Sequence, residues 1–282
     1  MHYEKKVGRS EPPQSTPLHS TDLSELKEST TPPLEKESKS RITKKQKKAI
    51  IIGSIVVAAA ILVPVISFSV YFYAFPRRTF QFYVNHGMVS RSLTVTTTRA
   101  NLDYYVNADH PHHSYADSNY SASVIESYCT PNDQELVDIA SQIRSKCLNP
   151  NDLEEVIDAL LSFTQAIGYK SELNDLAKYP FETIFRRGDC EDLSVLFGSL
   201  AVAMGYSAVL ILIDVYDEVD EEWGGHACIG ITLSPCPAST WHFDISGSEY
   251  YICETTSQGW LIGELPTSIP DYFLMDGYAF IN

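Results

Sequence analysis

The sequence lacks the residue patterns of the common metal-binding motifs. It has six cysteines, but no two of them stand at the CxxC spacing of structural zinc sites. Its most acidic stretch, residues 214–222, lacks EF-hand spacing, which excludes that type of calcium loop and favours a solvated one. Three histidines lie in a predicted loop, outside any helix or strand that would hold their ring nitrogens in a fixed geometry: His110, His112 and His113. We therefore expect no metal ion and no cofactor.

Positive charge is scarce after residue 48. Residues 49–282 hold 10 Lys and Arg against 29 Asp and Glu, a net charge of −19, while residues 1–48 have a net charge of +4. Nucleic-acid binding requires cations that neutralise phosphates. A body this acidic excludes nucleic acid as a partner and suits a domain that works in an extracellular medium.

Apolar periodicity is nearly absent from residues 1–48, which are rich in Ser, Thr, Pro, Glu and Lys. Such a segment buries too little apolar surface to offset the conformational entropy lost on folding. We predict a disordered tail over residues 1–48.

Charge is absent from residues 49–75, and nearly all of them are apolar. A helix needs about 20 apolar residues to cross a bilayer, so this run predicts one transmembrane helix and a lipid bilayer as a partner. Five cations precede the run (Arg41, Lys44, Lys45, Lys47 and Lys48), and only Arg77 and Arg78 follow it closely. The positive-inside rule then predicts a single-pass protein of the cell membrane, with a cytoplasmic N-terminus and residues 79–282 outside.

The remaining chain has the patterns of a mixed α and β protein. Residues 79–128 are predicted to be β-rich, with alternating strands at 80–84 and 92–98. Residues 129–282 form the main domain in this reading. Within it, Asp133–Lys146 and Leu153–Ile167 place apolar side chains at helical spacing.

The stretch after Gly188 contains a candidate nucleophile. Nearly every residue from Cys190 to Met204 tolerates a helix, Asp189 suits the N-cap, and Asp192 stands at the capping-box position. Cys190 is therefore predicted in the first helical turn. The free backbone N–H groups there favour a thiolate and can stabilise an oxyanion, whereas the neighbouring carboxylates raise the thiol pKa.

A base must therefore accept the thiol proton, and His226 is the best candidate. It follows Gly224-Gly225 and opens a strand-like run over residues 226–233. A third residue should orient the imidazole. Two candidates remain: Glu254, which ends the strand-like run 250–254, and Asp244, in the run 241–245. Trp223 is a possible cleft wall or oxyanion helper.

The blocks FRRGDCED, GGH and YYICETT, followed by Gly259-Trp260, resemble the Cys, His and Asp blocks of the transglutaminase-like superfamily. The likeness is strongest to the membrane-anchored transglutaminase-like proteins of archaea and extends upstream to residues 162–165 and 179–180. One departure is that many members have Asp-Pro-Thr where this chain has Glu-Thr-Thr.

The resemblance implies a papain-like α+β fold, in which the cysteine helix packs on an antiparallel β-sheet that carries the histidine and the acid. It implies Cys190 as the nucleophile, His226 as the general base and acid, and Glu254 as the orienting acid. The implied activity is acyl transfer on a glutamine carboxamide or peptide bond of a protein or peptide substrate, with crosslinking or hydrolysis as the outcome. The alternative is a non-catalytic cell-surface binding or structural module with the same fold.

Overall fold

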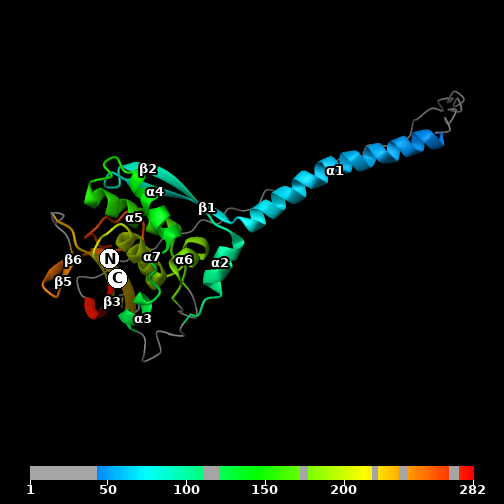
Figure 1. Cartoon of the computed structure of the whole chain (residues 1–282). Coiled ribbons are helices and arrows are strands. Elements are labelled where there is room, and N and C mark those ends of the chain that lie inside the picture. The colour runs from blue at the N-terminus through cyan, green and yellow to red at the C-terminus, as the bar shows by residue number, and fades with distance from the viewer. Residues whose placement is uncertain (1–42, 111–120, 172–176, 218–221, 235–240, 267–272) are drawn as a thin grey trace, which may run out of the picture. The chain divides into compact units, whose positions relative to one another are not determined.

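The computed structural model describes most of the chain from residue 43 onward (Figure 1). The described ranges are 43–110, 121–171, 177–217, 222–234, 241–266 and 273–282. Most of the predicted tail lies outside them, as do His112 and His113. Residues 59–282 form the compact unit that contains the candidate site.

Helix α1 (Lys44–Ala74) contains the apolar run and continues through Pro64. Its stretch Lys44–Tyr71 has a mean hydropathy of 2.9, and no part of it is buried by the rest of the protein. The helix is therefore long and apolar enough to cross a membrane. It begins before the predicted start at residue 49 because lysine is a good helix former.

A β-hairpin follows α1, formed by β1 (Arg77–Val84) and β2 (Val89–Thr96) in antiparallel register. Residues 79–128 are less β-rich than predicted, because two short helices follow the hairpin: α2 (Arg99–Val106) and α3 (Ala122–Glu126). The Thr98 side chain caps α2 by accepting the Asn101 N–H at 3.1 Å, and such caps favour helix over strand.

Four further helices follow: α4 (Gln134–Ser145), α5 (Leu153–Ile167), α6 (Pro180–Arg186) and α7 (Cys190–Ala203). Helix α7 packs on the main sheet, and α4, α5 and α6 pack against α7. The two amphipathic helices predicted from spacing are confirmed as α4 and α5. Asp133 and Asp152 cap them through hydrogen bonds to backbone N–H groups of the first turn.

Five strands form an antiparallel sheet in the order β5-β6-β4-β3-β7. They are β3 (Ala208–Asp217), β4 (Glu222–Ile231), β5 (His242–Ile245), β6 (Ser248–Cys253) and β7 (Phe273–Ile281). The described residues thus form a mixed α+β fold with an antiparallel sheet, as predicted. Strand β4 begins at Glu222 and not at His226, so His226 lies inside the strand instead of at its start.

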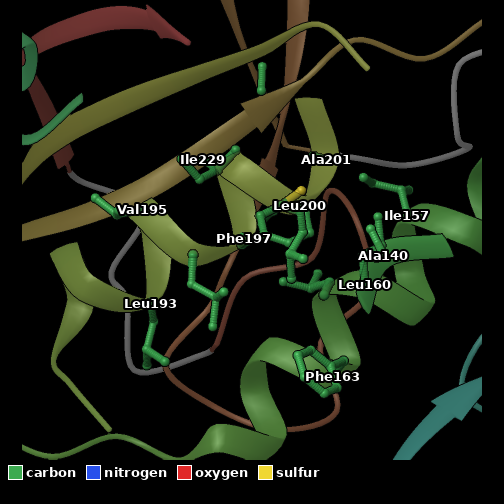
Figure 2. Close-up of a cluster of buried hydrophobic side chains, with 14 of the residues drawn as sticks. Ala140, Ile157, Leu160, Phe163, Leu193, Val195, Phe197, Leu200, Ala201 and Ile229 are labelled. Carbon is green, nitrogen blue, oxygen red and sulfur yellow. The ribbon is translucent and has the colours of Figure 1, made fainter. Parts of the chain in front are cut away.

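The largest apolar cluster lies between the sheet and the helices, with α7 at its centre (Figure 2). Leu160 and Phe163 of α5, Phe197 and Leu200 of α7 and Ile229 of β4 belong to it, and all are fully buried. Helix α7 is apolar on all sides because it is enclosed by α5 and the sheet. This packing fixes the position of Cys190 at its first turn.

We expect Leu160→Ala to lower the free energy of unfolding by about 2–5 kcal/mol, because it leaves a cavity between α5 and α7. Leu148→Ala is the matched control, since Leu148 is 56% exposed and its loss should change stability by less than about 0.5 kcal/mol. Chemical denaturation of the two variants checks this difference. Equal losses would show that α5 does not pack on α7 as described.

Candidate active site

The first turn of α7 is held by a capping box. Asp189 is the N-cap, and Asp192 accepts the Asp189 N–H at 3.3 Å, which confirms the predicted cap. Asp192 also accepts the Lys178 N–H at 2.6 Å and forms an ion pair with the Lys178 ammonium group. A Cβ at Gly188 would lie only 2.1 Å from Asp192 Oδ2. The sequence before Cys190 therefore requires glycine to let the cap close.

The start of α7 contacts the open edge of β4 at Ala227. Strand β6 pairs only with residues Ile229–Ile231 of β4, so the earlier residues of β4 have no strand on that side. The Ala227 carbonyl accepts the Ser194 hydroxyl at 3.1 Å, and the Ala227 backbone lies close enough to the Cys190 sulfur to lower the pKa of the thiol. One residue of β4 thus adjoins Cys190 and binds the next turn of its helix.

His226 precedes Ala227, and its Nε2 lies 2.9 Å from Glu254 Oε2. Glu254 follows β6 directly and is buried, and its other oxygen accepts both the backbone N–H and the hydroxyl of Thr256. Burial opposes ionisation of Glu254, but hydrogen bonds from His226 and Thr256 outweigh it and lower the pKa below its ordinary value. Because an ionised carboxylate only accepts hydrogen bonds, Nε2 carries the proton and Nδ1 is left as the basic nitrogen.

Cys190, His226 and Glu254 line the same open cleft, which has a volume of about 540 Å³. The other lining residues are Tyr169, Val215, Gly224, Gly225, Thr256, Ser257 and Pro266. Gly224 and Gly225, which precede His226, contribute no side chains to the cleft. The cleft is large enough for an extended side chain such as that of glutamine.

The alternative third residue, Asp244, lies elsewhere. It is in edge strand β5, opposite Glu249, and is not among the residues that line the cleft. Geometry therefore pairs Glu254 and not Asp244 with His226. Trp223 belongs to β4, but its side chain lies outside the described part of the structure, as do residues 218–221 of the acidic loop.

The acidic neighbours determine the electrostatics of the resting thiol. Burial, followed by the charge of Glu191, raises the pKa of Cys190 well above its ordinary value, and the Ala227 N–H lowers it only in part. The thiol donates a hydrogen bond to Glu191 Oε2 at 3.4 Å. The helix N-terminus alone therefore does not produce the thiolate, and the proton must be removed by a base.

Glu191 is itself held in its neutral form. Burial, with the charges of Asp189 and Asp192, raises its pKa to about 9. Burial also raises the pKa of Asp192 to about 7, against the opposing effect of Lys178. The carboxyl group next to Cys190 is thus protonated at neutral pH.

Two supporting residues carried no assignable role in the sequence. Gln165 of α5 donates to the carbonyls of Glu254 and Trp260 at 2.8 and 3.0 Å and accepts the Gly259 N–H at 3.1 Å. It thereby fixes the loop that carries Glu254. Lys178 supports Asp192 from outside the helix. Neither contact leaves a signal in local spacing, because both join segments that are distant in the chain.

Among the described residues, three groups of side chains place donor atoms within 4.8 Å of one another and could hold a metal ion. They are His86 with Glu154 and Asp158, His242 with Asp244 and Glu249, and Asp189 with Glu191 and Asp192. The last group flanks Cys190, but Lys178 already neutralises Asp192 there. Of the three loop histidines, His110 lies within the described residues, where its Nε2 is 3.1 Å from Glu182.

Comparison with known proteins finds similarity among solved structures only, and it is remote. No protein-family model matches the chain, and no curated protein matches it. Among solved structures, the chain is similar to one described as a "Putative Cysteine Protease" from Cytophaga hutchinsonii. The two chains are 16% identical, the match covers 73% of each, and the TM-score is 0.33. At this distance the assignment of the site depends on the geometry of this chain.

We expect Glu191→Gln to change the pH dependence of stability. Between the ordinary carboxyl pKa of 4.5 and about 9, native Glu191 keeps a proton that the unfolded chain loses. Its contribution to the free energy of unfolding therefore falls as pH rises through that window. Glutamine does not titrate, so the variant lacks this loss of stability. At pH 8 its melting temperature should exceed that of the unsubstituted chain by roughly 5 °C. At pH 4 the two melting temperatures should agree.

Thermal melts of the full chain in detergent at both pH values measure the effect. Glu264→Gln is the matched control, because Glu264 is exposed in a loop and its substitution should shift neither melt. Parallel pH profiles for Glu191→Gln and the unsubstituted chain would contradict the neutral state of Glu191.

Proposed function

We propose that this chain is a membrane-anchored cysteine acyl-transfer enzyme with a transglutaminase-like, papain-like fold. Its substrates are glutamine carboxamides or peptide bonds of proteins or peptides. The observation that carries the proposal is the shared cleft, in which Cys190, at a capped helix start, faces the same space as the hydrogen-bonded pair His226 and Glu254. These groups supply a nucleophile, a base and an orienting acid.

The arrangement of the elements supports the same assignment. Helix α7 packs on an antiparallel sheet, β4 carries His226, and Glu254 follows the neighbouring strand β6. The three residues occur in the order Cys, His and acid, which is the order of the sequence blocks. The deep burial of Glu254 and its two bonds from Thr256 hold it in one orientation toward the imidazole.

The first step begins with proton transfer. Nδ1 of His226 takes the proton from Cys190, and the sulfur attacks the carbonyl carbon of the substrate. The backbone N–H groups at the start of α7 stabilise the negative charge that develops on the carbonyl oxygen. The C–N bond then breaks, His226 protonates the leaving nitrogen, and ammonia or an amine departs from a thioester on Cys190.

The second step returns the enzyme to its resting form. An amine or a water molecule attacks the thioester carbon and gives its proton to His226, and the departing sulfur then regains a proton. An amine acceptor yields a crosslink, and water yields a carboxylic acid. The high pKa of the resting thiol makes the first transfer costly, so bound substrate must exclude water and align His226 with Cys190.

We further propose that α1 spans the cell membrane, with the N-terminus in the cytoplasm and residues 79–282 outside. The length and apolar composition of α1 support the span. The excess of lysine before it supports the orientation. The acidic body after it is consistent with work at the cell surface.

The alternative is a non-catalytic surface module with the same fold. The raised pKa of Cys190 favours it, since an inert buried thiol has the same property. The alternative assigns no task to the ordered His226–Glu254 pair. A direct assay of chemistry separates the two functions.

The assay incubates the full chain in detergent with glutamine-containing peptides, with and without a primary amine donor, and identifies products by mass. We expect amine adducts, deamidated peptide or cleaved peptide, and their complete loss in Cys190→Ala. Equal product with and without Cys190 would contradict the proposal. No product from a broad peptide set would favour the binding module.

The same assay tests the third residue. We expect Glu254→Gln to lower kcat by about 10²–10⁴-fold, because the neutral amide no longer fixes the tautomer of His226. Asp244→Asn is the matched control and should retain activity within about twofold. If Asp244→Asn abolished activity while Glu254→Gln retained it, the assignment of Glu254 would be wrong.

A further inference from the structure

Half of the basic residues after residue 48 gather at one place. Ten Lys and Arg follow that residue, in a stretch with 29 carboxylates. Five of the ten are arginines at the starts of β1 and α2 and at the end of α6, where the apolar helix α1 ends. We refer to these five as the arginine cluster: Arg77, Arg78, Arg99, Arg186 and Arg187.

Direct contacts hold the cluster together. Arg78 Nη1 donates to the carbonyl of Ile184 in α6 at 2.7 Å, which joins the start of β1 to the end of α6. The guanidinium carbon of Arg99 lies 5.7 Å from the ring centroid of Tyr73, in the last turn of α1. Helices α2 and α6 pack against each other, and Figure 1 shows them side by side.

Two cations of the cluster, Arg78 and Arg187, have no carboxylate partner among the described residues. Arg99 pairs with Asp103 at 3.0 Å, and Arg186 pairs with Glu182 at 3.1 Å. Within the described residues, no carboxylate lies at ion-pair distance from Arg78 or Arg187. Burial, together with repulsion from Arg187, lowers the pKa of Arg78. Like charges are thus brought together in an otherwise acidic body, a cost that a bound anion would remove.

We propose that the arginine cluster binds the phosphate groups of anionic lipids in the leaflet where α1 leaves the membrane. Guanidinium groups bind phosphate through two parallel hydrogen bonds, which makes arginine suited to this ligand. Tyr73 and Phe75 are aromatic residues at the end of the span and place the cluster at headgroup depth. The positive-inside rule disfavours cations on the translocated side, so their convergence there from distant segments calls for an anionic partner.

This binding has a consequence for the proposed enzyme. Arg187 precedes Gly188 and the N-cap Asp189, so a lipid held by Arg187 fixes the start of α7 relative to the bilayer. The cleft would then be held near the membrane surface and favour substrates there. The proposal depends on the span and orientation of the proposed function but not on its chemistry.

The test measures backbone hydrogen exchange of the full chain in nanodiscs. One set contains phosphatidylcholine only, and the other contains about one third phosphatidylglycerol. We expect the anionic lipid to slow exchange of residues 184–188 about tenfold at low salt, and high salt to remove the effect. The variant Arg186→Gln with Arg187→Gln should lose the slowing. The matched control, Arg144→Gln with Lys146→Gln, removes two cations at the end of α4 and should keep it.

Inorganic phosphate added to the phosphatidylcholine nanodiscs distinguishes a free anion from a lipid, and we expect it to slow nothing. The proposal is overturned if exchange is the same in both lipids, if the cluster variant keeps the slowing, or if phosphate alone reproduces it. If the variant is unstable, the salt dependence of the unsubstituted chain is the test. Slowing that persists at high salt would overturn the proposal. The experiment measures hydrogen exchange and not peptide turnover. A negative result would therefore contradict lipid binding without contradicting the proposed acyl transfer.

Discussion

The contact between the first turn of α7 and the open edge of β4 is the interaction on which the candidate site depends. Strand β6 ends its pairing before Ala227, so the backbone groups of that residue are free to bind the helix. The Ala227 carbonyl accepts the Ser194 hydroxyl, and its backbone lies near the Cys190 sulfur. His226 precedes Ala227 in the same strand. The proposed nucleophile and base are therefore positioned by adjacent residues of β4.

Charge around the nucleophile opposes ionisation at rest. Burial and the nearby carboxyl groups keep the Cys190 thiol protonated, and Glu191 is protonated as well. Glu254 is the exception, because its bonds from His226 and Thr256 hold it ionised. Glu254, which bonds the proposed base, is thus ionised, whereas Glu191, which accepts the Cys190 thiol, is neutral. This arrangement favours proton transfer to His226 only once substrate has excluded water.

Local sequence signals predicted the features that depend on neighbouring residues. The cap at Asp189 and the two amphipathic helices follow from the local sequence. The antiparallel α+β fold was implied by the resemblance of the sequence blocks. The predicted start of β4 at His226 was wrong. Residues 222–225 have no alternating pattern, yet their backbone pairs with β3. Residues 79–128 were expected to be β-rich, but the Thr98 cap starts a helix that strand alternation upstream did not indicate.

Contacts between distant segments could not be read from the sequence. Periodicity left Glu254 and Asp244 equal as partners of His226, and only the pairing of β5 with β6 separates their positions. Gln165 and Lys178 support the site from α5 and from the segment before α6, and apolar periodicity assigns neither side chain a role. The arginine cluster has the same origin, since it unites residues from β1, α2 and α6. Chain topology, and not composition, creates the His226–Glu254 pair, the supporting contacts of Gln165 and Lys178, and the arginine cluster.

The covalent intermediate tests the central claim most directly. The full chain is mixed with a glutamine peptide, quenched in acid and measured by intact mass and peptide mapping. The account predicts a thioester on Cys190 with the mass of the peptide less ammonia, which hydroxylamine releases and which does not form in His226→Ala. A peptide adduct on any other residue, or formation of the thioester at an unchanged rate without His226, would contradict it.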